Sequence, residues 1–291
     1  MRWWVALLPR ATRRGSFGDH YGYYSLRHEY PVFHVDAVFH RRDAIYPATV
    51  VGKPRQEDFF IGDYLQRLLS PLFPLVMPSV KDLWTYGETG FHSLCAAVVQ
   101  ERYGREALVS GFRILGEGQL SLTKFLLLTD TPQDLSNFPK LLEHVLERFR
   151  PETDLLCFQM SRWTTLDYTS GKVNEGSKAI MLGLGEPIEL EREFEGTLPN
   201  GVSRAEVFIG GCLVLQGPDL FRGRISWRAR GGVILHLKNW PLIVLHDDAS
   251  VARSSPTFCG LPGRGSNRLR TSTPQHYGSS SSSRLRGSNS H

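Results

Sequence analysis

The stretch KFLLLTDTPQDLSNFPKLLEHVLERFR, residues 124–150, decides the fold class. It opens with a continuous apolar run at 125–129, which is typical of a strand that is buried on both faces. A polar turn follows, and the apolar residues of 134–149 recur at the spacing of an amphipathic helix. A buried strand followed closely by such a helix predicts an α/β layer with a mostly parallel sheet.

The sequence on both sides of this stretch extends the prediction. Downstream of Tyr103, strands and helices alternate, with a helix at 105–115 and strands at 155–158, 205–215 and 242–245. Upstream of Tyr103, the chain is β-rich with one long helix; the predicted elements there are strands at 31–40, 45–51, 80–86 and 91–99 and a helix at 56–73. We therefore expect an α+β chain whose second part is α/β, with a domain boundary near Tyr103.

The charge distribution separates the body of the chain from its end. The net charge is +5, but residues 249–291 hold six Arg and no acid, which leaves 28 basic and 29 acidic residues, a net of −1, in residues 1–248. A near-neutral body argues against a specific nucleic-acid partner, although a basic tail can bind phosphate non-specifically. Residues 254–291 are rich in Ser, Arg and Gly, and we expect them to form a disordered tail.

Four widely spaced cysteines form no CxxC pair, so the sequence predicts neither a zinc site nor a disulfide framework. Buried, reduced thiols in a cytoplasmic protein are the expected reading. No stretch approaches the roughly 20 apolar residues of a membrane helix, so no transmembrane segment is expected. The start of the chain, MRWWVALLPRATRR, has too short an apolar run for a signal peptide, and we interpret it as non-targeting.

The strongest local motif is GSFGDHYGYYS, residues 15–25. Glycines flank Asp19, and several aromatic residues stand beside it. An acid held against aromatic surface is a candidate general acid near neutral pH, because desolvation disfavours a charged carboxylate. The alternative reading of the same residues is an Asx-type turn with tyrosines on the surface.

This motif is similar to the E-G-P-[FY]-G-[DE]-H-x-G-Y-Y signature of the UbiD family, whose members reversibly decarboxylate aromatic and α,β-unsaturated acids with prenylated flavin mononucleotide. Further segments resemble family motifs in the same order. They are Arg42-Asp43-Ala44-Ile45-Tyr46, Gly52-Lys53-Pro54 with Glu57, Thr123-Lys124-Phe125, and Gly176-Ser177-Lys178. We expect the resemblance to cover about residues 15–215.

The resemblance implies roles for two residues. Asp19 matches the family's proton donor, and Lys178 matches a lysine that reaches the cofactor phosphate. It also implies a domain order, listed here from the start of the chain: an unmatched segment at 1–14, a remnant of a split β-barrel flavin-binding domain at 15–103, an α/β oligomerisation-type domain at 104–253, and the tail. The family cofactor is prenylated FMN with a divalent metal, whose protein ligands lie upstream of the signature, so we assign no metal ligand here.

Two departures from the family pattern shape the functional prediction. Arg14 stands where the family has a glutamate, which reverses the local charge, and Ser16 replaces a proline. Most of the family's flavin contacts also come from the region before the signature, where residues 1–14 show no resemblance. Reading-frame breaks at the two ends are one hypothesis that accounts for this pattern.

We therefore predict a UbiD-type decarboxylase that acts on an aromatic acid, of the 4-hydroxybenzoate type used in quinone biosynthesis, and that is truncated and inactive by itself. A homo-oligomer is the expected assembly. The alternatives are a non-catalytic oligomerisation or interaction fragment and, third, a nucleic-acid binder that uses the basic tail, which lacks the interleaved aromatic residues typical of such binders.

Overall fold

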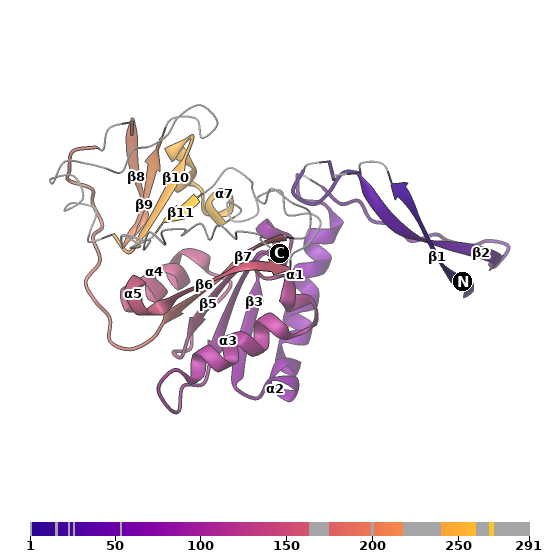
Figure 1. Cartoon of the computed structure of the whole chain (residues 1–291), viewed down its shortest axis with the longest axis horizontal. Coiled ribbons are helices and arrows are strands. Elements are labelled where there is room, and N and C mark those ends of the chain that lie inside the picture. Colours follow the sequence, from indigo (N-terminus) through magenta and orange to yellow (C-terminus); the bar gives the residue numbers. More distant parts are fainter. Residues whose placement is uncertain are drawn as a thin grey trace, which may run out of the picture.

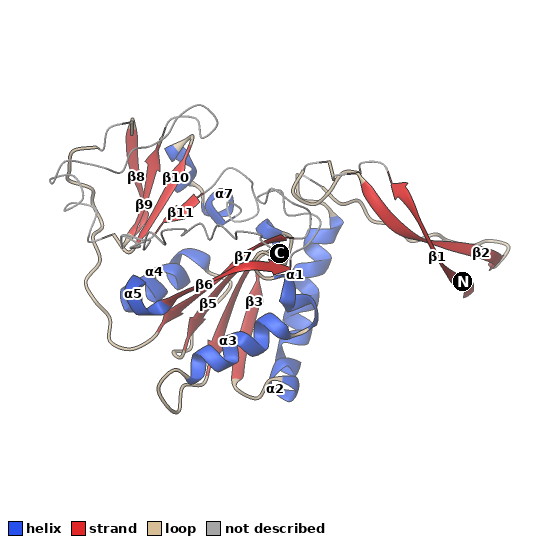
Figure 2. Cartoon of the chain, in the orientation of Figure 1, coloured by secondary structure: helices blue, strands red, loops and turns tan. Residues whose placement is uncertain are grey.

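The structure is a computed structural model, and it describes residues 2–14, 17–22, 24–25, 27–52, 54–162, 175–198, 201–217, 240–259 and 268–270. Within these residues the longer strands form three sheets, which Figures 1 and 2 show as a central sheet flanked by helices, a second sheet packed beside it, and a projecting hairpin.

The central sheet has five strands in the order β3-β4-β5-β7-β6, of which β4, β5 and β7 are parallel to one another. The strands are β3 (Val80–Thr85), β4 (Leu94–Val99), β5 (Phe125–Thr129), β6 (Leu155–Arg162) and β7 (Glu175–Gly183). The prediction at 125–129 is therefore confirmed to the residue. Its apolar run reflects burial on both faces, since Leu126 and Leu128 contribute to one core cluster and Leu127 to the other.

Helices cover both faces of this sheet. The helix α3 (Glu106–Gly116) packs Ala107 and Ile114 into the cluster that contains Leu128, and α4 (Phe138–Arg148) packs on the opposite face. The short α5 (Pro151–Asp154) leads into β6. The helix α4 begins at Asn137, whose side chain accepts a hydrogen bond from the backbone N–H of Lys140 and so caps the helix.

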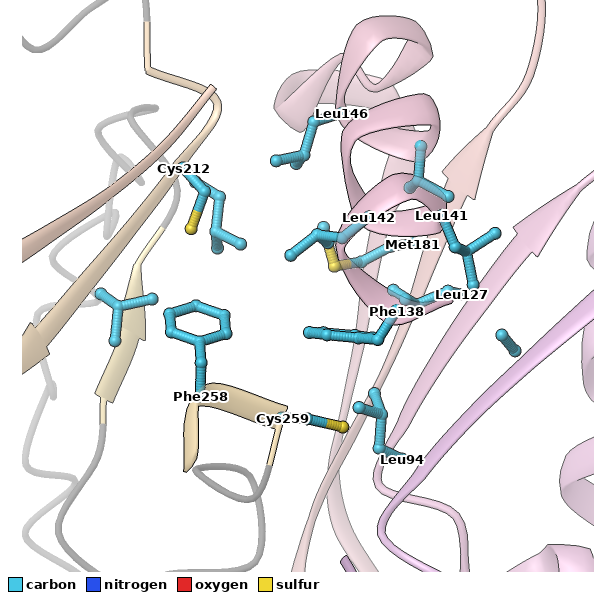
Figure 3. Close-up of a cluster of buried hydrophobic side chains, with 14 of the residues drawn as sticks. Leu94, Leu127, Phe138, Leu141, Leu142, Leu146, Met181, Cys212, Phe258 and Cys259 are labelled. Atoms are coloured by element: carbon cyan, nitrogen blue, oxygen red, sulfur yellow. The ribbon is translucent and has the colours of Figure 1, made fainter. Parts of the chain in front are cut away.

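The second sheet has four strands in the order β11-β10-β9-β8. They are β8 (Arg204–Ile209), β9 (Cys212–Gln216), β10 (Leu242–His246) and β11 (Arg268–Arg270), and the 3-10 helix η4 (Ala249–Arg253) and α7 (Ser255–Cys259) follow β10. Figure 3 shows this unit facing α4, with Cys212, Phe258 and Cys259 directed toward Leu142 and Phe138 across one continuous core.

The amino-terminal part differs. The strands β1 (Arg2–Arg14) and β2 (His28–Phe39) form an antiparallel hairpin that points away from the rest of the molecule in Figure 1. The helix α1 (Glu57–Leu69), the 3-10 helix η1 (Ser70–Leu72) and α2 (Phe73–Val76) then lie beside β3, the edge strand of the central sheet.

Several predicted elements need correction. The residues at 45–51 form no strand and are all exposed, because no neighbouring strand pairs with them in the described structure. The strand predicted at 205–215 is two strands, β8 and β9, which turn at Gly210 and Gly211, where Gly211 adopts a φ of 75°. Sequence reasoning missed β1 and β7, because β1 shows no clear period and β7 begins with polar residues.

The end of the chain also departs from expectation. Within 254–291, α7 and β11 are formed, and Phe258 is buried with its ring stacked on Phe208 at 3.9 Å. The other residues from 260 onward lie outside the described structure, so the tail is described only in part. The five-stranded sheet also continues across Tyr103, so the boundary expected there does not coincide with an edge of the sheet.

Three of the four cysteines are buried as free thiols, whereas Cys157 is exposed. Burial raises the pKa of the Cys95 and Cys212 thiols far above the usual range, which keeps them protonated. Among the helices that the structure describes, none is long and apolar enough to cross a membrane.

Candidate active-site loop and lysine

The acid-bearing motif forms a small closed loop. The Phe17 N–H donates to the Ser25 hydroxyl at 3.1 Å, and the Ser25 N–H donates to the Phe17 carbonyl at 2.9 Å. At the tip, the Tyr21 N–H donates to Asp19 Oδ1 at 2.9 Å, which is the Asx-type turn that the sequence offered as an alternative. The tight reversal suits Gly22, whose φ is 84°.

Asp19 is buried inside this turn, with 3% of its surface exposed. A carboxylate is costly to bury unless hydrogen-bond donors compensate for lost water, and the backbone N–H of Tyr21 is one such donor. The aromatic residues of the motif do not share one environment, because Tyr21 is buried whereas Tyr24 is 78% exposed. The turn and the sequestered acid therefore coexist in one loop.

Tyr21 fastens the loop to the central sheet. Its hydroxyl donates to the Thr89 carbonyl at 2.8 Å and lies 2.7 Å from the hydroxyl of Ser93. Thr89 ends the 3-10 helix η2 (Gly87–Thr89), and Ser93 stands directly before β4. All three residues are buried, so this contact joins the loop to residues about 70 positions away in the protein interior.

His20 occupies a notch that a glycine leaves open. A Cβ on Gly90 would lie 1.9 Å from His20 Nε2, and Gly90 has a φ of 66°, which favours glycine. The ring of His20 packs at 4.2 Å, between centroids, from the ring of Tyr21. Burial lowers the pKa of nearby His92, against the raising effect of its hydrogen bond to the side chain of Gln119. His20 and Tyr21 together dock the loop on η2.

The start of α1 supports the same region. The ring of Phe59 lies 5.9 Å from that of Phe91, and a Cβ on Gly87 would collide with both rings. The guanidinium of Arg55 lies 4.1 Å above the ring of Phe59 and forms an ion pair with Glu88 of η2. The loop, η2 and the first turn of α1 are therefore one packed unit.

Lys178 lies on β7, at the end of the central sheet where β4 and β5 begin. Its Nζ donates to the carbonyls of Ser121 and, at 3.0 Å, Thr123. Burial lowers the pKa of Lys178 to about 8, because the ammonium has lost much of its water. Such a cation is costly to bury, and an anion placed beside it would offset that cost.

Backbone hydrogen bonds connect Ser93, which the Tyr21 side chain contacts, to the strand that carries Lys178. The Ser93 carbonyl accepts hydrogen bonds from the N–H groups of Lys124 and Phe125, and the Ala179 N–H donates to the Lys124 carbonyl at 2.8 Å. Residues 93, 124 and 178 thus form a row across three neighbouring strands: residues 93 and 124 directly precede β4 and β5, and residue 178 lies in β7. Ser93, which contacts Tyr21, and Lys178 are two strand spacings, about 10 Å, apart.

This row lies at the amino ends of the parallel strands β4, β5 and β7. Ligands of open α/β sheets bind beyond the carboxyl ends, so the placement is opposite to the general rule for that fold class. At the carboxyl end, a cavity of about 790 Å³ is lined by Glu147, Trp240 and 188–195, and five of its lining residues are glutamates. Those carboxylates suit a flavin phosphate poorly.

Sequence reasoning predicted roles for Asp19 and Lys178, which stay predictions, and it missed the residues that hold the loop: Tyr21, Gly90, Thr89, Ser93 and Arg55. The glycines at 87 and 90 were the available sequence signal for a place where other side chains pack closely against the backbone. Lys53 lies outside the described residues, as does the side chain of Arg14, so the charge reversal predicted there stays a prediction. In the described part of the chain, no three His, Cys, Asp or Glu residues gather in a way that could hold a metal.

Comparisons with known proteins match two parts of the chain. The profile of the 3-octaprenyl-4-hydroxybenzoate carboxy-lyase C-terminal domain matches residues 59–183, and that of the Rift-related domain of the same carboxy-lyase matches residues 6–54. The second match begins at residue 6, so similarity covers residues 6–14 of the segment 1–14 that we expected to be unmatched.

One curated relative, a 4-hydroxybenzoate decarboxylase subunit from Chlamydia pneumoniae, is 52% identical over 245 residues, which is 82% of this chain and 41% of the relative. The chain therefore spans about two fifths of the length of that relative.

Among solved structures, vanillic acid decarboxylase from Sedimentibacter hydroxybenzoicus in closed form is similar, with a TM-score of 0.52, 22% identity, and coverage of 67% of this chain and 42% of that chain. At this identity the likeness establishes the fold. The UbiD-class enzyme HmfF from Pelotomaculum thermopropionicum, in complex with FMN, matches with a TM-score of 0.47 and 21% identity over 66% of this chain and 42% of that one.

Proposed function

The chain belongs to the UbiD family of carboxy-lyases, and from that premise we propose that it serves the decarboxylation of an aromatic acid, with Asp19 as the proton donor. The observation that carries this proposal is the loop of residues 17–25, which Tyr21 fixes to the central sheet. Asp19 is buried, bound by a backbone N–H, and fixed to the central sheet through Tyr21. A proton donor needs this kind of fixed position close to the reacting carbon.

The family cofactor is prenylated FMN, and the described residues fit one end of it. Lys178 offers a half-desolvated ammonium, and a phosphate beside it would restore the favourable environment that burial removed. When bound, the flavin supplies an electron sink for the pair of electrons that carbon dioxide leaves behind. This chain's residues would hold the phosphate at Lys178 Nζ and deliver a proton from Asp19 to the carbon that lost the carboxyl group.

The finer parts of the proposal rest on the family resemblance. They are a substrate of the 4-hydroxybenzoate type, a role in quinone biosynthesis, a cytoplasmic location, a homo-oligomeric assembly, and a flavin-binding split barrel to which the β1–β2 hairpin would contribute. The proposal also keeps the expectation that the chain alone does not turn over substrate, because Asp19 and Lys178 provide an acid and an anchor but not a complete wall around a flavin.

The test is a decarboxylation assay on 4-hydroxybenzoate and related aromatic acids. The full chain is supplied with prenylated FMN, a divalent cation and the part of the Chlamydia pneumoniae relative that precedes the matched segment. Carbon dioxide release should fall at least about 100-fold in Asp19→Asn, the usual range for loss of a general acid. Flavin absorbance in the purified complex should be unchanged. An unaltered rate in Asp19→Asn would contradict the assignment.

The second candidate function is a non-catalytic interaction fragment. The observation that favours it is the amount of apolar surface left exposed on the amino-terminal part of the chain. Absence of decarboxylation in every mixture, together with stable complex formation, would favour this alternative over the first.

A further inference from the structure

The acid loop, which we define as residues 17–25, rests on the receiving segment, which we define as residues 89–93. The first and the last residue of the receiving segment bind the hydroxyl of Tyr21, and its second residue, a glycine, makes room for His20. Its fourth residue, His92, places its ring 6.3 Å from that of His20, between centroids. The path of the receiving segment therefore decides where the loop and its acid are held.

The backbone of the receiving segment adopts an unusual conformation. Gly90 and Phe91 are consecutive residues with a positive φ, of 66° and 59°. This left-handed region suits glycine but is unfavourable for a bulky residue such as Phe, and it persists only where surrounding contacts enforce it. The ring of Phe91 is one such contact, because it fills the space above Gly62 and Gly87, where a Cβ would lie 2.5 and 2.9 Å from it. The contacts of the residue that follows Phe91 therefore matter for the same conformation.

That residue, His92, ties the receiving segment to a second element. Its side chain forms a hydrogen bond with the side chain of Gln119, which lies in the 3-10 helix η3 (Gly118–Leu122). Burial lowers the pKa of His92 and this bond raises it, as expected where the imidazole N–H donates and the side-chain oxygen of Gln119 accepts. His92 is half-buried and Gln119 is exposed, so the bond lies at the rim of the interior.

The helix η3 is in turn tied to the central sheet by Lys178. None of its five residues is fully buried, and Leu120 packs, half-buried, against the core cluster that contains Leu128. The Nζ of Lys178 donates to the carbonyls of Ser121 and of Thr123, the residue that ends the helix. A cation suits this place, because the last carbonyls of a helix lack partners within the helix. Lys178 therefore helps to hold η3 in place.

We propose that Gln119 and Lys178 are positioning residues for Asp19. Lys178 holds η3, Gln119 of η3 holds His92, and His92 steadies the segment that receives the acid loop. Lys178 thereby acts on the acid loop without any bound group, in addition to the phosphate contact proposed above. The inference rests on the proposed function only in the use that it gives to the proton of Asp19.

Hydrogen exchange of the Tyr21 and Ser25 amides measures how firmly the acid loop is held, because both N–H groups bond within it. The experiment uses the purified full chain without cofactor or substrate. Gln119→Ala should speed the exchange of both amides about fivefold, the effect of one lost hydrogen bond. The amides of β5, in the middle of the central sheet, should keep their rates, which separates local opening of the loop from unfolding of the whole chain.

Two matched variants test whether the hydrogen bond itself is responsible. Gln119→Glu keeps a side-chain oxygen that can accept from His92, so the exchange of the loop amides should stay within about twofold of the unmodified chain. Gln133→Ala removes a similar contact at the carboxyl end of β5, where Gln133 Nε2 lies 3.3 Å from His144 Nδ1. The loop amides should exchange at the same rate in Gln133→Ala as in the unmodified chain. Because Gln119 is exposed, its truncation leaves no cavity in the core.

Lys178→Met tests the first step of the route from the sheet to the loop. It removes the donor that holds η3 and should speed the exchange of the two loop amides at least about threefold. In a chain that already carries Gln119→Ala, it should add a change of less than about twofold, because both substitutions interrupt the same route. Effects of the two substitutions that multiply fully would overturn the positioning role of Lys178.

Three outcomes would overturn the positioning role of Gln119. They are unchanged exchange of the loop amides in Gln119→Ala, an equal rise in the loop and in β5, and the same rise in Gln119→Glu as in Gln119→Ala. The decarboxylation assay decides separately about the proposed function. If Asp19→Asn keeps its rate of carbon dioxide release while Gln119→Ala opens the loop, Asp19 is not the proton donor and the positioning contact stands.

Discussion

The strand β4 and the helix α1 stand at opposite extremes of burial. All six residues of β4 are buried, whereas α1 buries none of its 13. Both segments were predicted from apolar patterns, and both patterns formed the expected element. The difference teaches that an apolar pattern specifies an element and a face but not the partner of that face. In the α/β part the partner is within this chain, and in the amino-terminal part it is not among the described residues.

The largest expected effect is on the free energy of unfolding, and it contrasts a buried leucine of β5 with an exposed leucine of α1. Leu128 of β5 is fully buried, so Leu128→Ala should lower the free energy of unfolding by about 2–5 kcal/mol. Leu68→Ala removes the same atoms from a side chain that is 58% exposed and should change the free energy by about 0.5 kcal/mol or less. Urea unfolding of both variants measures the difference. An equal loss of unfolding free energy in the two variants would mean that Leu68 is already buried in the isolated chain.

The second prediction concerns the notch that receives His20. Gly90→Ala should cost about 2–3 kcal/mol, since it adds a collision with His20 to the strain of a positive φ. Gly118→Ala is the matched control, because Gly118 has a φ of 44° but open space around its Cβ, and it should cost about 1 kcal/mol.

Hydrogen exchange distinguishes the two glycines further. If His20 anchors the acid loop, Gly90→Ala should raise the exchange of the Tyr21 and Ser25 amides, both of which are hydrogen-bonded within the loop. Gly118→Ala should leave those amides protected. Unchanged exchange in Gly90→Ala would show that the loop holds its place without the notch.

The third prediction concerns the contact of Tyr21 that joins the acid loop to the start of β4. Tyr21→Phe removes the hydroxyl that binds Thr89 and Ser93 and should cost about 1 kcal/mol. Combined with Ser93→Ala in a double-mutant cycle, it should give a coupling energy of about 0.5–1.5 kcal/mol. Tyr24→Phe, at a position that is 78% exposed, is the control and should be neutral. Additive losses from Tyr21→Phe and Ser93→Ala would contradict the hydrogen bond between them.

The α/β part was the more predictable from sequence, for a physical reason. The strand at 125–129 is flanked by polar residues and buried on both faces, so its apolar run and its bounds coincide. The strand predicted at 45–51 contains Pro47 and has no pairing strand in the described structure, and Ile45 is 92% exposed. Pro47, which has no backbone N–H to donate, was a local signal against this strand, whereas the pairing of a strand depends on residues far away in the sequence.

In the candidate site, too, local motifs were predictable from sequence and long-range contacts were not. Asp19 and Lys178 followed from short motifs, each of which is contained within a few consecutive residues of the chain. The contacts of Tyr21 could not be predicted, since they join residues that are 68 and 72 positions apart. The placement of Lys178 at the amino edge also depends on the order β5-β7-β6, in which β7 inserts between two strands that precede it.

The smallest expected effect is the pH dependence that Lys178 confers. The fold holds the pKa of Lys178 at about 8, and unfolding returns it to the usual value of 10.5. Below pH 8 both states carry the proton. Between about pH 8 and 10.5 the unfolded state binds more protons, so the contribution of Lys178 to stability rises with pH. Solvent screens a side chain that is only half-buried, which keeps this rise small.

Lys178→Met should remove that rise, whereas Lys140→Met, on the exposed side of α4, should retain it. Urea unfolding at pH 7.5 and pH 9.5 measures the two slopes, and the same slope in Lys178→Met and the unmodified chain would contradict burial of the ammonium. Added flavin mononucleotide sharpens the comparison. A phosphate that binds the ammonium stabilises its charged form, so the rise should move to higher pH in the unmodified chain and stay absent in Lys178→Met.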